Sequence, residues 1–586
     1  MRDTGLRFLL PYMRPYRGLL LLGLLYGLIG ASASALSPAV LGWAVDELLA
    51  VFRVQVLGYY ALSLIGLAAT LAFFRYRLRM LSGTIAVGVS YQMSQDLFNT
   101  ILTLDQRALR QYGTGDLLSR ATSDFIYIWR FYSAGFQMSV HALFLLLIGC
   151  TLMALTSPML ASIVVIMLAV SIGVQVGLGR IVERAFDRVQ RDLAVLSAFT
   201  QEHLSAVRML AAYTQEQAVV NDFRRLNDRY ARQNLAFVLR SSAITPLPSL
   251  VVMVARAIVL GMGGIMIIDG SLTIGQYVQF IVYLGLLSNA AQQLSRALER
   301  LQQGSAAAGR IGEVLLRRPG IADGPEAIST PIRGDLRFEN VGVRAEHRWI
   351  LRDISIDIPA GTTLGIVGAT GAGKSTLLSL IGRIRDPDAG QVYVDGVDAR
   401  KYKLKHLRQA IALVPQETLL FSMPLRDNIS FGLKDVPDER VLSAVQAARL
   451  SNDLVQLPQG LATVVGERGA SLSGGQKQRT AIARALVRDP QILLLDDALA
   501  SVDTKTAAEI VHELSSARTQ RTTLIVSQRL AAVREADQII VLEDGRIVER
   551  GTHHELLAQQ GRYAAMYRRE LHQNEDEETK NLEPRT

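Results

Sequence analysis

The chain has a single cysteine, Cys150, among its 586 residues. An intrachain disulfide needs two thiols, so this fold is not cross-linked in that way. Cys150 lies within an apolar run, which predicts a core or lipid-facing position. Lysine is absent before Lys374. The basic residues of that long stretch are arginine or histidine, and they cluster beside apolar runs, as at the cytoplasmic edges of a membrane.

Charged residues are also scarce. They make up 20% of the chain, whereas hydrophobic residues make up 49%, which is high for a wholly soluble protein. The formal net charge is +9, which by itself would suit a nucleic-acid binder. The position of the arginines beside apolar runs favours a membrane protein and no nucleic-acid partner. The length predicts about three to four domains.

A glycine-rich loop lies between an apolar strand and a helix. Its residues are Gly368, Ala369, Thr370, Gly371, Ala372, Gly373, Lys374, Ser375 and Thr376. They form a P-loop pattern in the strand–loop–helix context that the motif requires. The glycines let backbone N–H groups surround phosphate oxygens, and the helix N-terminus faces the same anion. Lys374 would neutralise phosphate charge, and Ser375 would offer an oxygen to Mg²⁺. A glycine-rich turn without a ligand is the alternative.

Six apolar segments are each near or above the roughly 20 residues that a helix needs to cross a bilayer. They lie at about 18–44, 54–75, 131–156, 158–179, 246–268 and 275–295. The sixth is the least hydrophobic, because several glutamines interrupt it. A signal peptide is the competing interpretation of the N-terminus, but the first apolar run is too long and more spans follow. Residues 1–16 mix arginine with apolar residues, which predicts an interfacial helix.

Two long amphipathic segments, at about 80–130 and 180–245, follow the second and fourth spans. Each predicts two antiparallel helices, with turns near 112–116 and 213–216. Arginines open both segments, whereas the other connections are nearly free of arginine. The positive-inside rule therefore predicts that both termini and both long segments are cytoplasmic. Independent soluble hairpins are the alternative to rods that extend the spans and touch the ATPase domain.

Further motifs follow the P-loop in a fixed order. Gln416 lies in a Val-Pro-Gln-Glu segment, and Asp496 ends the apolar strand 492–496. An apolar strand that ends in an acid is typical of a buried parallel strand, and Asp496 could hold Mg²⁺ there. A further segment opens a helix that runs from Lys477 onward; its residues are Leu472, Ser473, Gly474, Gly475 and Gln476. We expect a transmembrane domain at 17–310, a linker at 311–334, an ATPase domain at 335–572 and a polar tail at 573–586.

This order of motifs resembles the ATP-binding cassette (ABC) family, whose signature the Leu472–Gln476 segment resembles. Over about residues 5–572 the chain resembles a half-transporter of the ABC exporter type, with the type IV exporter fold. The resemblance implies an all-α six-helix transmembrane domain with long cytoplasmic helical extensions. An α/β P-loop ATP-binding cassette domain with an α-helical signature subdomain would follow. Residues 112–120 resemble the first coupling-helix region of the family.

The resemblance also implies how nucleotide binds. Two cassettes would enclose two ATP molecules, each between the P-loop of one chain and the signature helix of the other. Mg²⁺ would be held by Ser375, Gln416 and Asp496, and Gln416 would sense the γ-phosphate. Asp503 matches the loop that crosses to the other site. Residues 463–469 resemble the exporter segment that meets the coupling helices.

Three positions depart from the family pattern. The glutamate that polarises the attacking water is replaced by Asp497, whose carboxylate is withdrawn by about 1 Å, which costs on the order of 10²-fold. The switch histidine is replaced by Gln528, an amide that cannot carry a positive charge. The adenine-stacking aromatic is replaced by Ala345, and His347 or Trp349 could substitute for it.

The first two departures resemble the degenerate-site subunit of a bacterial heterodimeric multidrug-resistance ABC exporter. They predict good Mg-ATP binding but slow hydrolysis at this P-loop. The signature would complete a competent site on a second half-transporter with intact Glu and His. A homodimeric exporter that uses Asp497 as its base is one alternative, and an ATP-gated regulator or channel is another. The implied location is the bacterial inner (plasma) membrane.

Polar residues inside the spans are candidates for a substrate cavity, because ionisable groups at membrane depth usually face protein or water. Arg256 in the fifth span is the first candidate. In the third span His141 and Gln137 lie one helical turn apart and share a face. A structural pair with a neighbouring helix or the partner chain is the alternative. Such a cavity allows amphipathic drugs, lipids or peptides and does not rank them.

Overall fold

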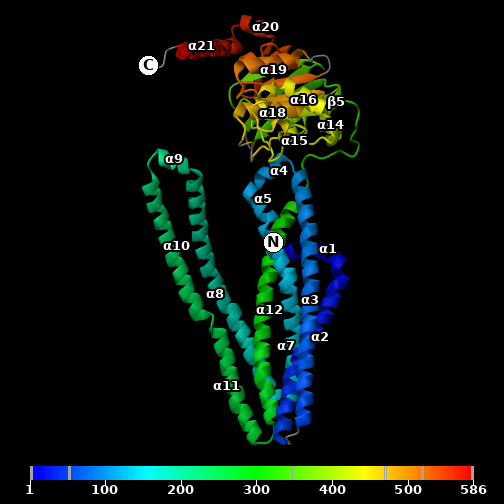
Figure 1. Cartoon of the computed structure of the whole chain (residues 1–586), viewed down its shortest axis with the longest axis vertical. Coiled ribbons are helices and arrows are strands. Elements are labelled where there is room, and N and C mark those ends of the chain that lie inside the picture. The colour runs from blue at the N-terminus through cyan, green and yellow to red at the C-terminus, as the bar shows by residue number, and fades with distance from the viewer. Residues whose placement is uncertain are drawn as a thin grey trace. The chain divides into compact units, whose positions relative to one another are not determined.

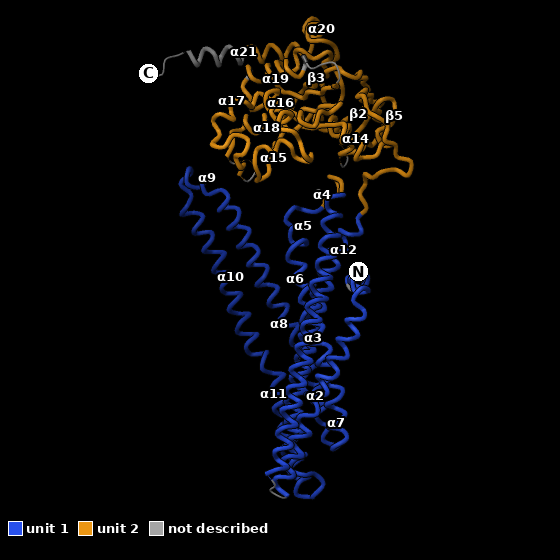
Figure 2. The backbone as a smooth tube through the Cα atoms, turned by 45° about the vertical axis from the view of Figure 1, so that its right-hand side comes forward, with its two compact units in different colours: residues 1–103, 112–317 blue, residues 104–111, 318–586 orange. Residues whose placement is uncertain are grey.

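The computed structural model describes residues 4–50, 54–345, 348–466, 469, 471–516 and 521–582. The chain forms two compact units (Figure 2). Unit 1 comprises residues 1–103 and 112–317, and unit 2 comprises residues 104–111 and 318–586. The predicted linker, 311–334, therefore contains the point where the chain passes from unit 1 into unit 2.

Every regular element among the described residues of unit 1 is a helix. Its α-helices are α1 (Thr4–Met13), α2 (Arg17–Ala50), α3 (Val54–Thr103), α5 (Thr114–Ala121), α6 (Ser123–Arg130), α7 (Phe136–Thr156), α8 (Pro158–Ser205), α9 (Val207–Ala212), α10 (Glu216–Ile244), α11 (Leu247–Ile268) and α12 (Ile274–Leu315). A short π-helical turn, Phe131–Gly135, joins α6 to α7. This turn is a local widening of the helix, a feature often found at functional sites.

Several of these helices are long and apolar enough to cross a membrane. Among the described residues the stretches that qualify by length and composition are Arg7–Ala50, Val54–Thr103, Thr114–Thr156, Pro158–Ser205 and Glu216–Ile268. The predicted sixth span lies in α12, which is not among these stretches. Its glutamines lower the hydropathy, so its place in the membrane stays a prediction.

Small residues let α2 and α12 approach closely. A Cβ atom on Gly42 of α2 would lie 2.7 Å from the backbone oxygen of Gly275 in α12, so only glycine fits. Asp46 of α2 accepts a hydrogen bond of 2.7 Å from the Gly275 N–H. Thr273 and Gln276 form a capping box that starts α12. Backbone contact through small residues is the usual way in which membrane helices pack.

The helices α8, α10 and α11 form an arm that diverges from α3, α7 and α12 toward α9 (Figure 1). An ion pair of 3.2 Å between Arg229 of α10 and Asp192 of α8 links its two long helices. The connection between α8 and α10 comprises α9 at 207–212 and the non-helical residues 213–215, so it includes the turn predicted near 213–216. Leu204, Met209 and Tyr213 are exposed beside it, so the tip of the arm is apolar.

Unit 2 contains two sheets. Their strands are β1 (Leu336–Ala345), β2 (Arg348–Ile358), β3 (Thr363–Gly368), β4 (Ala389–Val394), β5 (Val397–Asp398), β6 (Ile411–Val414), β7 (Ile492–Asp496), β8 (Thr522–Val526), β9 (Gln538–Glu543) and β10 (Arg546–Gly551). One sheet has the order β2-β1-β4-β5 and is antiparallel. The other has the order β10-β9-β3-β8-β7-β6, and its pairs from β9 to β6 are parallel.

Helices complete unit 2. They are α4 (Gln106–Gln111), α13 (Lys374–Ile381), α14 (Leu404–Ala410), α15 (Leu425–Ile429), α16 (Asp438–Ala447), α17 (Ser451–Leu454), α18 (Gly474–Leu486), α19 (Thr504–Ser516), α20 (His553–Ala558) and α21 (Arg562–Leu582). Along β7, Leu493 and Leu495 join one hydrophobic core, whereas Ile492 and Leu494 join the other. Both faces of this sheet are therefore covered, as a parallel sheet requires.

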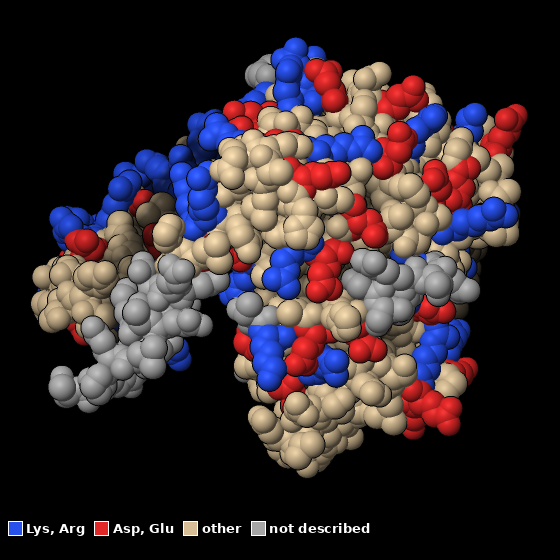
Figure 3. Space-filling view, turned by 90° about the horizontal axis from the view of Figure 1, so that it is seen from above, with Lys and Arg blue, Asp and Glu red and all other residues tan. Residues whose placement is uncertain are grey.

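On the face seen in Figure 3, acidic and basic side chains are interspersed among the described residues. Mixed charge of this kind is typical of a surface in contact with water. The predicted combination of a helical membrane domain with an α/β P-loop domain is confirmed.

Candidate nucleotide site

The P-loop connects the end of β3 to the start of α13. Gly371 and Gly373 have φ values of 84° and 100°, in the left-handed region that favours glycine. A Cβ atom on Gly373 would lie 2.7 Å from a methyl carbon of Leu351 on β2. The loop is therefore a backbone cradle at a helix N-terminus, and its shape fits a phosphate group.

Lys374 points back into this cradle. Its Nζ donates hydrogen bonds to the carbonyl oxygens of Gly368 and Ala369, at 2.7 and 2.9 Å. Burial lowers the pKa of the ammonium group, while the charges of Asp497 and Asp496 act in the opposite direction. The loop carbonyls thus fix a positive charge where the phosphates of a nucleotide would lie.

Ser375 and Asp496 meet across the site. The Ser375 hydroxyl donates to Oδ1 of Asp496 at 2.9 Å, although 121 positions separate the two residues. Burial raises the pKa of Asp496, the charge of Asp497 raises it further, and the Ser375 hydrogen bond lowers it. One hydroxyl and one carboxylate fit Mg²⁺, which keeps several waters and takes its other ligands from phosphates. These two residues would hold the ion and place its charge beside the phosphates.

Asp497 and Gln416 lie at the same edge of the sheet. Asp497 directly follows β7 with φ of 50°, and its N–H donates to the Val526 carbonyl of β8 at 2.9 Å. Its side chain is 8% exposed. Nε2 of Gln416 donates a long hydrogen bond of 3.5 Å to Oδ2 of Asp497. The structure therefore brings Gln416, Asp496 and Asp497 together, as the sequence predicts.

Gln528 and Asp503 lie on loops that follow strands β8 and β7. Gln528 is exposed, and within the part of the chain that the structure describes it has no hydrogen-bond partner. Asp503 accepts a hydrogen bond of 2.9 Å from the Thr506 N–H at the start of α19. That bond lowers the pKa of the Asp503 carboxyl. Asp503 thus caps a helix and remains exposed at the surface.

The signature segment forms the N-terminus of α18. Ser473 and Gln476 make a capping box, in which Ser473 Oγ accepts from the Gln476 N–H at 3.3 Å. Leu472 is buried, whereas Ser473 and Gly474 are exposed. A Cβ atom on Gly475 would lie 3.1 Å from the Ser501 carbonyl oxygen. An ordered, exposed helix N-terminus of this kind provides N–H donors for an anion.

The adenine position has no obvious aromatic platform among the described residues. Ala345 ends β1, opposite Arg348 of β2. The Arg344 guanidinium lies 4.0 Å from the ring centroid of Trp349, so an arginine already covers one face of that ring. His347 lies outside the described residues. Two residues of the predicted coupling segment 463–469, Glu467 and Arg468, also lie outside them.

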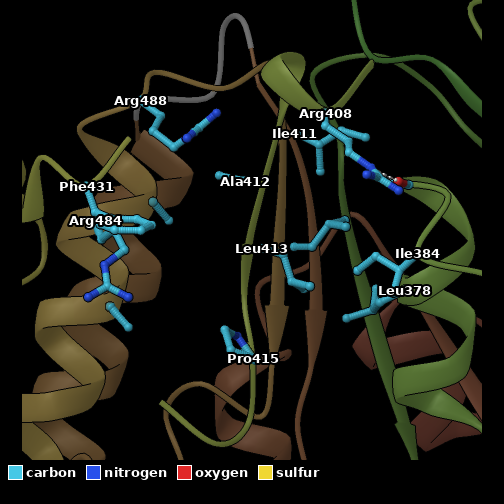
Figure 4. A pocket seen from close by; sticks show the side chains of 14 residues that line it. Leu378, Ile384, Arg408, Ile411, Ala412, Leu413, Pro415, Phe431, Arg484 and Arg488 are labelled. Atoms are coloured by element: carbon cyan, nitrogen blue, oxygen red, sulfur yellow. Dashed lines mark hydrogen bonds between the residues drawn. The ribbon is translucent and has the colours of Figure 1, made fainter. Parts of the chain in front are cut away.

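A second pocket, of about 300 Å³, lies beside β6 and was not predicted. Phe431 and Arg484 line one side, and Leu378 and Ile384 line the other (Figure 4). The Arg484 guanidinium lies 5.7 Å from the centroid of the Phe431 ring. Pro415, directly before Gln416, also lines this pocket. No sequence motif marks it, because the fold alone brings these segments together.

The candidate cavity residues are only partly brought together. Gln137 and His141 line one cavity of unit 1. Arg256 does not line it; its guanidinium is exposed and lies 3.6 Å from where a Cβ atom on Gly285 of α12 would be. The same cavity is lined by Arg296 and Arg300, neither of which was predicted. Their spacing of four residues at the end of a span was an available signal.

Two protein-family models match the chain. The model described as "ABC transporter transmembrane region" matches residues 20–291. The model described as "ABC transporter" matches residues 351–500. The two matches cover most of the long membrane helices and the segment from β2 to the end of the Asp496–Asp497 loop.

Similar proteins come from several bacteria. YheI of Bacillus subtilis, a probable multidrug resistance ABC transporter ATP-binding/permease protein, is 36% identical over 81% of this chain and 82% of its own length. An ATP-dependent lipid A-core flippase of Aromatoleum aromaticum is 32% identical over 95% of both chains. A bacterial Atm1-family ABC exporter with ATP bound superposes with a TM-score of 0.82 and 25% identity, covering 95% of this chain and 98% of the other.

Proposed function

The chain belongs to the ABC transporter family as an exporter half-transporter, and from this premise we propose that it is the degenerate-site subunit of a heterodimeric exporter. An ABC exporter is a membrane-embedded translocase that uses ATP. The observation that carries the proposal is that Asp497 and Gln528 stand where the family has Glu and His, while the P-loop geometry of the same unit is complete. Such a site would bind Mg-ATP and hydrolyse it slowly.

Asp497 is poorly suited to be a general base. Its backbone is fixed by the hydrogen bond to Val526, and its side chain is buried and contacts Gln416. The carboxylate therefore cannot move outward to recover the length of the missing methylene. A displacement of about 1 Å from the water that attacks phosphorus is enough to lose on the order of 10²-fold in rate. Asp496 is occupied with Ser375 and does not replace it.

Gln528, at the position of the switch histidine, removes a second contribution to ATP hydrolysis. A histidine at this position could carry a positive charge toward the γ-phosphate, whereas an amide offers only a neutral hydrogen bond. Gln528 is exposed in this structure, and it is an uncharged side chain. The shorter carboxylate of Asp497 and the missing histidine charge at Gln528 both weaken the attack on the γ-phosphate. Together they support slow hydrolysis more strongly than either change alone.

The signature segment supports the other half of the proposal. Ser473 is exposed with its capping box formed, and the absence of a Cβ atom at Gly475 lets the helix start pack against the Ser501 carbonyl oxygen. These features suit contact with the γ-phosphate of an ATP bound to a second subunit. That subunit would carry Glu and His at the matching positions and supply most of the hydrolysis.

Alternating access would connect ATP to transport. ATP would draw two cassettes together, the rods would carry that motion to the spans, and the cavity would turn from the cytoplasm to the outside. Hydrolysis at the competent site would reset the cycle. The relatives named for multidrug resistance and for lipid A support a cargo of drugs or lipids, and amphipathic peptides stay a further candidate. The proposed location is the bacterial inner membrane.

The partner is tested by purification. A tagged copy of this chain, extracted from its native membrane, should co-elute with an equal amount of a second half-transporter that has Glu and His at the positions of Asp497 and Gln528. The chain expressed alone should bind ATP but hydrolyse it slowly. A homodimer of this chain that hydrolyses ATP at rates typical of transport ATPases would refute the heterodimer proposal. ATP-dependent accumulation of cargo in inverted vesicles separates a pump from a gated channel.

The proposed orientation is tested with single cysteines in a Cys150→Ala background. Ser119→Cys lies in the first long segment, 80–130, and Ser197→Cys lies in the second, 180–245. Both should resist an impermeant thiol reagent added to intact cells. Ser271→Cys, exposed between the fifth and sixth predicted spans, is the matched control and should be labelled. Labelling of either rod from outside would reverse the assignment.

A further inference from the structure

The uncharged length of α2 sets the depth of the residues that precede it. Residues 18–45 include no charged side chain, and this run is bounded by Arg17 on one side and Asp46 on the other. Both residues belong to α2, and at the rise of an α-helix they lie about 44 Å apart. A bilayer with its headgroup regions is about 40–45 Å thick. Arg17 therefore reaches the headgroups of one leaflet, and α1 directly before it lies at a similar depth.

One face of α1 is fixed against the helical bundle. Gly5 and Leu9 are buried, and a Cβ atom on Gly5 would overlap the carbonyl oxygen of Ser305 in α12. The Tyr12 hydroxyl donates a hydrogen bond of 2.8 Å to Asp96 of α3. The helix α1 is therefore attached to α12 and α3 at the side of the bundle, and its other face points away from them (Figure 1).

The outward face carries three arginines. Arg7, Arg14 and Arg17 are exposed, and Leu10 lies between the first two and is 57% exposed. These four residues follow one another at spacings of three or four along a backbone that stays helical from α1 through the turn 14–16 into α2. Residues at this spacing share one helix face. We call Arg7, Leu10, Arg14 and Arg17 the arginine surface.

The arginine surface is not neutralised by protein groups. Within the part of the chain that the structure describes, none of its three arginines forms an ion pair or a side-chain hydrogen bond. The sequence has no Asp or Glu between Thr4 and Asp46. By contrast, Arg229 on the exposed side of α10 pairs with Asp192 at 3.2 Å. Three uncompensated positive charges therefore lie at the depth of the lipid headgroups.

Anionic phospholipids have the chemistry that this surface fits. Guanidinium groups form paired, charge-assisted hydrogen bonds with phosphate oxygens. Each arginine beside an anionic bilayer surface favours binding by about fivefold. Leu10 lies between two of the arginines and can enter the boundary of the acyl chains, as apolar residues of interfacial helices do. Charge, depth and the mixed character of the face all match a lipid.

We propose that the arginine surface is a docking site for anionic phospholipid headgroups, and that these lipids hold the end of α12 in place through α1. The second part follows from the contact between the two helices. A Cβ atom on Gly312 of α12 would lie 2.6 Å from the Phe8 ring of α1. Since α12 leads to residue 317, where unit 1 ends, lipid charge would act on ATP hydrolysis. This inference goes beyond the proposed function and does not depend on the cargo.

The first measurement compares two lipids beside Leu10. Leu10→Cys in a Cys150→Ala background, with any cysteines of a co-purifying subunit replaced, is labelled with a fluorophore in bilayers. Quenching by phosphatidylglycerol and by phosphatidylcholine, each with brominated acyl chains, gives the relative affinity of the two lipids. Phosphatidylglycerol should bind at least about fivefold more tightly at low salt, and added salt should reduce this preference. Excess glycerol phosphate should not abolish it, because a free anion has no acyl chains.

Substitution of the three arginines tests the surface itself. Arg7→Gln with Arg14→Gln and Arg17→Gln should give about equal affinity for the two lipids, because the charges that favour phosphatidylglycerol are gone. The corresponding lysine variant keeps the charges and should keep most of the preference. That variant separates loss of charge from damage to the helix.

The matched control removes three exposed arginines from the arm formed by α8, α10 and α11. Arg191→Gln with Arg224→Gln and Arg232→Gln changes the net charge by the same amount. It should leave the lipid preference at Leu10 unchanged.

The steady-state ATPase rate tests the role of α12. The rate of the assembled protein should rise as phosphatidylglycerol replaces phosphatidylcholine, and the glutamine variant of the arginine surface should not respond. Phe8→Ala loosens the contact with Gly312 but keeps the arginines. This variant should retain the lipid preference and lose the response of the ATPase.

Several results would overturn the inference. Equal quenching by the two lipids would show that headgroup charge is not recognised, and no quenching by either would place α1 away from the bilayer. Loss of the preference in the arm variant would assign it to the charge of the whole protein. An ATPase rate that does not depend on phosphatidylglycerol would remove the role of α12. None of these results shows which P-loop hydrolyses ATP, so the degenerate-site proposal is tested separately.

Discussion

Two regions of unit 2 are proposed to contact nucleotide, and they differ in the part of the chemistry that their residues support. The P-loop region has its glycines, Lys374 and the Ser375–Asp496 pair in place, but has Asp497 and Gln528 where the family has Glu and His. The signature region, Leu472–Gln476, has its full motif and a formed capping box. The difference teaches that binding and hydrolysis use different atoms of one site, so substitutions can separate them.

The strongest expected effect comes from the signature region. In the assembled pair, Ser473→Ala with Gly475→Glu should lower steady-state hydrolysis by about 10²-fold, comparable to the loss of preorganised donors in other sites. A glutamate at position 475 would press on the Ser501 carbonyl oxygen, which would lie only 3.1 Å from its Cβ atom, and would repel the γ-phosphate. A steady-state ATPase assay measures this loss.

The control for this substitution is Val455→Ala, at a position that is 88% exposed in the same unit. It should leave the ATPase rate unchanged. Replacing the predicted glutamate of the partner with glutamine should match the signature loss. If the signature variant retained most of its hydrolysis, this chain would not complete the active site, and the comparison between the two regions would fail.

Restoring the family residues in the P-loop region should raise the ATPase rate, by a smaller factor than the signature substitutions lower it. In the chain expressed alone, Asp497→Glu with Gln528→His should raise the ATPase rate by about tenfold or more, because a placed general base contributes at least that much. Asp497→Asn with Gln528→His is the matched control, which adds the histidine without a base. A repaired chain that stays as slow as this control, while still binding ATP, would mean that other residues limit hydrolysis.

The smallest effect is expected from removing the carboxylate alone. Asp497→Asn in the assembled pair should change the steady-state rate by less than about twofold, because little hydrolysis would pass through a misplaced base. The measurement is the same ATPase assay, with ATP binding followed in parallel. If Asp497→Asn proved as damaging as the Glu→Gln change in the partner, both sites would be catalytic and the two regions would not differ in function.

Much of the fold could be predicted from the sequence, because these elements follow local residue patterns. The apolar strand 492–496, the strand before the P-loop and the helix after it all appear where the sequence predicts them. Capping residues such as Ser473 and Thr273 mark helix starts directly. The meeting of Ser375 with Asp496 was also predicted, because both lie at the carboxyl edge of parallel strands in one sheet.

Other features depend on packing between distant segments and left little local signal. The inclusion of α4 in unit 2, the π-helical turn before α7 and the pocket beside Phe431 belong to this class. The cavity in unit 1 was only half predicted. His141 and Gln137 were selected as polar residues inside a span. Arg75 and Arg79 were interpreted only as a membrane flank, and Arg296 and Arg300 were not selected. Only the fold shows that Arg75 and Arg300 share one space.

The most direct test of the central claim is to follow the γ-phosphate of ATP bound at the P-loop of this chain. The assembled pair is incubated with γ-labelled azido-ATP until steady turnover is reached, and the bound nucleotide is then crosslinked by light. The account predicts that this chain retains the γ-label while the partner loses it, with an α-labelled sample showing equal occupancy of both. Loss of the γ-label from both chains at the same rate would contradict the account.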